Sequence, residues 1–157
     1  QKFLSSKIKK KIGKVISPEG KTIGSHQGIQ FYTIGQKAGE NIGIKITKPK
    51  GFEQKRFYIA QKLKPNTLVV APENHKLLFK KEVILKNLHL INPNNKIPSS
   101  LKARIRHLGQ LPKGRLTKKN SKYHFIFNKP VEAIAEGQYI VIYSGNKVVG
   151  SGEIRLK

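Results

Sequence analysis

The sequence predicts a mainly β protein in two parts, and three observations support this fold class. Short runs rich in Val, Ile, Phe and Tyr recur along the chain, and these residue types favour strands. Clusters of Gly, Pro, Asn and Ser separate the runs, as expected for turns. No long segment repeats its apolar residues with the helical period of 3.6, so we expect little helix.

The first part is predicted to be a small β-rich central domain over residues 11–78, preceded by a tail or linker at residues 1–10. Two pairs of strands are expected in it, one around the turn Ser17–Gly20 and one around Lys64–Asn66. The four predicted strands cover residues 12–16, 21–25, 56–61 and 67–71. The polar segment 45–54 is expected to be irregular.

The triplet Gly20-Lys21-Thr22 does not form a phosphate-binding loop in this prediction. That motif requires a glycine five positions before the glycine of its Gly-Lys pair, and Val15 occupies that position.

The second part, residues 79–157, contains short strand candidates at regular spacing, which is typical of a small sandwich or barrel. The candidates are residues 82–90, 101–107, 113–118, 122–127, 138–143 and 147–154. Turn clusters such as Asn92–Asn95 and Ser144–Asn146 separate them.

The chain is strongly basic, with 32 lysines and arginines against 8 acidic residues and a formal net charge of +24. Such a balance favours a polyanionic partner, above all a nucleic acid. The alternative is compositional drift, because an AT-rich genome also enriches lysine, asparagine and isoleucine.

Several function classes are excluded by composition. The absence of cysteine excludes disulfides, thiolate metal sites and a cysteine nucleophile. All the acidic residues are glutamates, so a Ser-His-Asp triad is impossible. No two of the five histidines lie four residues apart, so we expect no metal site. Without cysteine, aspartate or a phosphate-binding loop, we also expect no catalytic or cofactor site in this chain. No apolar run approaches the roughly 20 residues of a membrane helix.

The segment 101–106 alternates most sharply between apolar and basic residues. If it is a strand, Lys102, Arg104 and Arg106 lie on one face, about 6.6 Å apart. Three cations at that spacing suit a phosphate backbone, and the alternative is an ordinary solvent-exposed face.

The stretch Gly24–Lys37 is the least generic part of the chain. Its residues His26-Gln27-Gly28 and Tyr32-Thr-Ile-Gly-Gln36-Lys37, followed by Gly43-Ile44, resemble the central domain of the tRNA-specific 2-thiouridylases. The same residues also predict loop architecture, in which Phe31, Tyr32 or Ile34 fixes the loop by burial.

The second part resembles the same family in three further places. Arg104-Ile-Arg106-His107 is similar to a barrel-strand motif of the family, although histidine replaces its usual aromatic residue. Gly137-Gln138 is similar to a Pro-Gly-Gln motif with Glu136 in place of the proline. The ending Gly150-Ser-Gly152 resembles a triple glycine.

The resemblance implies the fold and the role of the chain. In this family an N-terminal domain uses ATP to adenylate the wobble uridine of certain tRNAs, and two of its cysteines deliver sulfur. The chain resembles only the central domain and the C-terminal six-stranded antiparallel β-barrel, which is similar to domain 2 of elongation factor Tu. Because it begins at Gln1 without a methionine, we expect it to be a fragment of such a protein.

The resemblance therefore implies a tRNA-binding portion of a tRNA-uridine 2-sulfurtransferase that is inactive alone. We expect tRNA as its partner, with ATP and a sulfur-carrier protein acting through the upstream domain. A cytoplasmic monomer without a membrane partner is also expected. The predicted tRNA contacts are Arg106, His107 and Gln138, together with Arg104 and Lys102. The alternative is a stand-alone basic β-barrel that binds ribosomal or other structured RNA.

Overall fold

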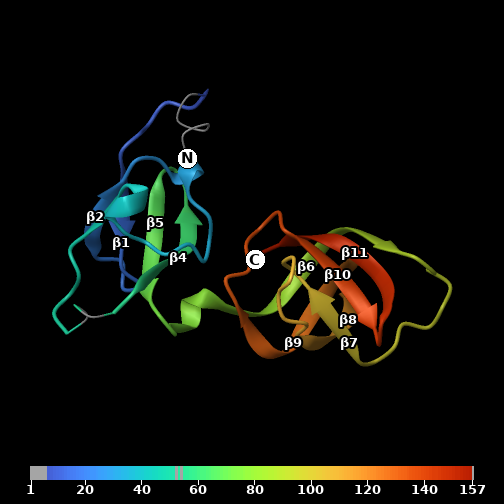
Figure 1. Ribbon diagram of the computed structural model, residues 1–157. Coiled ribbons are helices and arrows are strands. Elements are labelled where there is room, and N and C mark those ends of the chain that lie inside the picture. Colours follow the sequence, from blue (N-terminus) through green and yellow to red (C-terminus); the bar gives the residue numbers. More distant parts are fainter. Residues whose placement is uncertain (1–6, 52, 54, 157) are drawn as a thin grey trace. The chain divides into compact units, whose positions relative to one another are not determined.

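The computed structural model describes residues 7–51, 53 and 55–156, and Figure 1 shows that strands dominate them. The fold is mainly β, as the sequence predicts. Most of the predicted tail, residues 1–6, lies outside the described residues. The helical elements in the described ranges are short 3-10 turns at Ile29–Phe31 (η1), Glu40–Ile42 (η2) and Lys76–Leu78 (η3), apart from the single helical residue Lys7. No helix found there is long and apolar enough to span a membrane.

The chain divides into two units, Gln1–Leu78 and Phe79–Lys157. The first unit contains a five-stranded sheet in the order β3-β2-β1-β5-β4. Its strands are β1 (Gly13–Ile16), β2 (Thr22–His26), β3 (Ile44–Ile46), β4 (Phe57–Leu63) and β5 (Thr67–Pro72). The two predicted hairpins, β1–β2 and β4–β5, are confirmed, and β1 and β5 join them as a parallel pair.

Strand β3 differs from the prediction, which made residues 45–54 irregular. It pairs with β2, with Ile44 opposite His26 and Ile46 opposite Gly24. Ile44 is fully buried, and the neighbouring Lys45 is exposed. Three residues are too few for an alternating pattern to distinguish a strand from a loop, so pairing with β2 defines this strand.

The glycine-rich stretch Gly24–Lys37 begins in β2, passes through η1 and then docks against β4. Phe31 and Tyr32 are only 8% and 2% exposed, as the sequence predicts, whereas Ile34 is half-buried. The N–H of Gly35 donates to the carbonyl of Ile59 at 2.8 Å, which ties the stretch to the sheet.

His26 is the polar centre of this stretch and is 2% exposed. Its Nδ1 accepts a hydrogen bond from the N–H of Gly28 at 3.0 Å, so Nδ1 carries no proton. Its Nε2 donates to the carbonyl of Asn66 at 3.3 Å. The Tyr32 ring meets the imidazole at an 88° angle, with centroids 5.6 Å apart. Gly13 provides the space, because a Cβ there would lie 2.4 Å from Nε2.

The second unit is a closed antiparallel barrel in the order β10-β11-β6-β9-β8-β7 (Figure 1). Its strands are β6 (Phe79–Leu90), β7 (Leu101–Arg104), β8 (Lys113–Lys119), β9 (Lys122–Glu132), β10 (Tyr139–Ser144) and β11 (Lys147–Arg155). The six predicted strands are confirmed. The largest differences from the predicted bounds are that β6 begins at Phe79 rather than at Glu82, β7 ends at Arg104 rather than at His107, and β9 extends to Glu132. The bounds of β8, β10 and β11 differ by one residue.

Alternate residues of these strands fill the barrel. Phe125 and Phe127 on β9 are fully buried, with ring centroids 5.0 Å apart. Gly114 on β8 makes room for them, because a Cβ at this position would lie 2.5 Å from the Phe125 ring and 2.4 Å from the carbonyl of Ile126. The basic residues on these strands are therefore directed outward, where a partner can reach them.

Candidate nucleic-acid interface

Arg106 lies just beyond β7, in the loop that leads to β8. The ladder between these strands ends because Ala103 donates to the carbonyl of Pro112 at 3.0 Å, and proline has no N–H to return a bond. Arg106 is exposed, and its Nη2 donates a hydrogen bond to the carbonyl of Ala133. A guanidinium has five N–H donors, so others remain for an anion.

His107 follows Arg106 in the same loop and is also exposed. Strand alternation, which would place these two side chains on opposite faces, does not apply here because β7 has already ended. The next residue, Leu108, is 84% exposed and has a positive φ of 57°. The loop therefore presents the imidazole at a turn, where it is accessible to a base or a phosphate.

Gln138 precedes β10, and its side chain is already engaged within the barrel. Its Oε1 accepts a hydrogen bond from the N–H of Ala135 at 2.8 Å, so this oxygen is already engaged within the protein. The side-chain NH₂ has no partner within the part of the chain that the structure describes. Gln138 thus shapes the loop before β10 and keeps donor capacity for a ligand.

Arg106 and Gln138 act on the same segment, the β9–β10 loop at residues 133–138. Arg106 donates a hydrogen bond to the carbonyl of Ala133, the first residue of this loop. Gln138, its last residue, accepts a hydrogen bond from the N–H of Ala135. Arg155 on β11 anchors the middle, with Nη1 3.0 Å from Oε1 of Glu136. Two predicted RNA contacts that are far apart in the sequence are therefore brought to one end of the barrel.

Lys102 and Arg104 lie on the outer face of β7, because Leu101 and Ala103 beside them are buried. Across the sheet, Lys102 lies opposite both Tyr143 on β10 and Lys113 on β8. The predicted three-residue stripe is therefore wrong at Arg106, which has left the strand. We call the group formed by Lys102, Arg104, Lys113 and Tyr143 the outer basic face.

Arg104 packs over Tyr143, with its guanidinium carbon 5.9 Å from the ring centroid. Its Nε is buried without a hydrogen-bond partner in the described residues. This contact fixes the stem of the side chain against an aromatic surface. The sequence alone did not identify Tyr143 or Lys113 as members of this face, because cross-strand register is not visible in a linear pattern.

The first unit has a second group of cations at a hollow of about 280 Å³, whose lining includes Lys37, Lys48, Lys55 and Arg56 together with Glu40. No group of three or more histidine, cysteine or acidic side chains in the described ranges is placed to hold a metal ion.

Comparison with protein families matches both parts of the chain. Residues 1–72 match the family described as tRNA methyl transferase PRC-barrel domain. Residues 80–154 match the family described as Aminomethyltransferase beta-barrel domain.

Curated relatives cover almost the whole chain. A tRNA-specific 2-thiouridylase MnmA from Coxiella burnetii is 36% identical over 157 residues, which is 97% of this chain and 42% of the relative. The protein of the same name from Pseudomonas aeruginosa is 31% identical, covering 97% of this chain and 40% of the relative. That from Vesicomyosocius okutanii is 32% identical, covering 99% and 42%. The chain thus spans about two fifths of the length of these relatives.

Proposed function

The chain belongs to the tRNA-specific 2-thiouridylase family, as its central and C-terminal domains, and we propose that it binds the tRNA that such an enzyme modifies. The outer basic face is the observation that carries this proposal. Its three cations come from the adjacent strands β7 and β8: Lys102 lies between Lys113 and Tyr143, and Arg104 packs over that tyrosine.

The physical basis of the proposed binding is charge neutralisation of phosphates. Each lysine or arginine that meets a phosphate releases condensed counterions, so affinity falls as salt rises. The barrel unit contains sixteen lysines and arginines against four glutamates, which favours the approach of any RNA. The fixed positions of the outer basic face and of Arg106 then favour one orientation of the bound molecule.

In this proposal the chain holds tRNA and does not modify it. Adenylation of uridine needs a phosphate cradle, and sulfur transfer needs a thiolate. This sequence has no cysteine, and Val15 replaces the first glycine of the phosphate-loop pattern. ATP and a sulfur-carrier protein would then act with the N-terminal catalytic domain of the family, which installs 2-thiouridine at the wobble position. We further propose that the protein works as a cytoplasmic monomer.

Fluorescence anisotropy with labelled tRNA at several KCl concentrations tests the proposal. The variant Lys102→Gln/Arg104→Gln removes two cations of the outer basic face while keeping long polar side chains. We expect weaker binding and a salt slope shallower by about 2, one per lost phosphate contact.

The matched control is Lys96→Gln/Lys122→Gln, which removes two exposed lysines of the same unit that are not members of this face. If the control weakens binding equally, the RNA is held by general charge and the outer basic face is not its site. Equal competition by an unrelated structured RNA, such as 5S ribosomal RNA, would instead favour a general RNA-binding barrel.

A further inference from the structure

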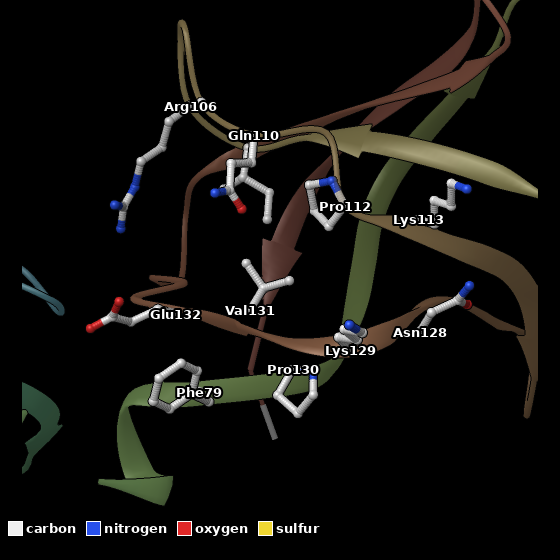
Figure 2. Close-up of a pocket in the computed structure, with 12 residues that line it drawn as sticks. Phe79, Arg106, Gln110, Pro112, Lys113, Asn128, Lys129, Pro130, Val131 and Glu132 are labelled. Atoms are coloured by element: carbon white, nitrogen blue, oxygen red, sulfur yellow. The ribbon is translucent and has the colours of Figure 1, made fainter. Parts of the chain in front are cut away.

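A groove of about 670 Å³ opens at the end of the barrel where β7 finishes. One wall is the loop between β7 and β8. The opposite wall is the second half of β9, which departs from regular pairing with β6. Figure 2 shows the loop residues Gln110 and Pro112 facing Val131 and Pro130 across this space.

An irregular register creates the β9 wall. Lys80 pairs with Val131 and Glu82 pairs with Ile126, so residues 127–130 of β9 lie opposite Lys81 alone. Extra residues in one strand push it out of the ladder and redirect its side chains. The displaced segment includes Asn128, Lys129 and Pro130, and all three line the groove.

The lining combines an apolar interior with a cationic rim. Its apolar side chains are Phe79, Ile105, Pro112, Pro130 and Val131. Three cations, Arg106, Lys113 and Lys129, share the rim with one carboxylate, Glu132. Figure 2 places Glu132 and Arg106 toward one end of the groove and Lys113 and Asn128 toward the other.

Two amide side chains add hydrogen-bonding capacity on opposite walls. Gln110 comes from the loop and Asn128 from β9, and neither amide group has a partner within the described part of the chain. Each offers a donor pair and an acceptor, which suits the edge of a nucleobase.

We propose that this groove holds one unpaired nucleotide of a bound RNA, with the base against the apolar lining and its phosphate at the Lys113 end. A free inorganic anion would gain nothing from the five apolar side chains, and a purely apolar ligand would leave the rim cations unused. A nucleotide satisfies both, because its base has an apolar face and a polar edge. The volume lies within the range of small-molecule sites.

The position of Lys113 supports the same assignment. This residue lies opposite Lys102 on the outer basic face and also lines the groove. A backbone that follows the outer basic face therefore reaches the groove at Lys113. This inference rests on the proposed RNA-binding function and specifies how the barrel recognises an unstacked base.

Methyl NMR of the whole chain, titrated with CMP, UMP, AMP and GMP, tests the proposal directly. We expect shifts at the methyl groups of Ile105 and Val131, with Val83 in the barrel core and Val70 in the first unit unchanged. Ribose 5-phosphate is the comparison probe, and it should bind at least fivefold more weakly because it has no base. Equal affinity for ribose 5-phosphate, or shifts that avoid the groove methyls, would overturn the proposal.

A groove-filling variant provides the second test. Asn128→Trp places an indole at the β9 wall and should weaken mononucleotide binding about fivefold or more. Asn146→Trp adds the same side chain at the exposed β10–β11 turn and should have no effect. Unchanged mononucleotide binding by Asn128→Trp contradicts the groove assignment. If the parent chain binds tRNA but no mononucleotide, the groove assignment fails alone; if it binds neither, the proposed function fails.

Discussion

The guanidinium of Arg106 donates a hydrogen bond to the carbonyl of Ala133, across 27 residues of sequence. Ala133 has a positive φ of 56°, which is uncommon for a residue with a Cβ, and it begins the loop that Gln138 closes. Arg106 therefore has two functions in our proposal: it stabilises this loop and keeps its remaining donors for a phosphate. The two functions can be separated by substitution.

Arg106→Ala should weaken tRNA binding and make the salt slope shallower by about 1, because one phosphate contact is lost. Arg106→Lys keeps the charge and should keep most of the slope, but it cannot reproduce the planar fork that reaches both a phosphate and Ala133. Anisotropy at several KCl concentrations measures both effects. Parent-like binding by both variants would mean that the RNA contacts lie elsewhere on the chain.

Gln138→Ala should destabilise the barrel by about 1–3 kcal/mol, because it leaves the N–H of Ala135 without its acceptor. Ala135 is only 6% exposed, so water replaces that acceptor poorly. We also expect weaker tRNA binding with little change in salt slope, since no charge is removed. Urea unfolding and anisotropy give the two quantities.

Gln138→Glu is the matched variant, because it retains an acceptor oxygen at the same distance from the backbone. It should recover most of the lost stability. If alanine and glutamate variants unfold alike, the hydrogen bond to Ala135 does not stabilise the loop.

Most of the fold could be predicted because it depends on local patterns. The barrel strands are regular apolar runs between turn residues, and β10 and β11 differ from their predicted bounds by one residue. The strand ends that were predicted wrongly depend on hydrogen bonds to a neighbouring strand. β7 ends at Arg104 because Pro112 cannot donate to it, although the alternating pattern continues to Arg106.

The sequence predicted several of the cations of the candidate site, but it did not predict how the site is shaped. Lys102 and Arg104 were found from alternation, and Lys113 and Tyr143 join them only through cross-strand register. The groove arises from the irregular pairing of β6 with β9, and no residue in the sequence predicts this change of register. Gln138 was identified through family resemblance, but the hydrogen bond to Ala135 depends on three-dimensional loop geometry.

The isolated chain should show no ATP hydrolysis and no ATP-dependent transfer of sulfur into tRNA. It has no cysteine to carry a persulfide, and thiolate chemistry cannot be supplied by another side chain. Incorporation of radioactive sulfur into tRNA measures the activity, with a full-length relative as positive control. Measurable incorporation by the chain alone would contradict our proposal that this chain binds tRNA and that the N-terminal domain modifies it.

The first unit should become less stable as the pH falls below about 6.5, the ordinary pKa of histidine. Burial lowers the pKa of His26, against a smaller opposing effect of the Asn66 carbonyl. The unfolded chain then binds a proton at a pH where the folded chain does not, so acid favours unfolding. Above the ordinary pKa, both states are neutral and this effect disappears. Urea unfolding followed at the Ile44 methyl group, which lies in this unit's core, measures it.

His26→Asn identifies the source of this pH dependence. An asparagine oxygen can accept the hydrogen bond from the N–H of Gly28, but it does not titrate and does not reach the carbonyl of Asn66. We expect this variant to be less stable than the parent at pH 7.5 and to lose less stability between pH 7 and pH 5. His75→Asn is the control, because His75 lies in the same unit and is not among its buried residues. A parent-like pH profile for His26→Asn would assign the acid sensitivity to a different group.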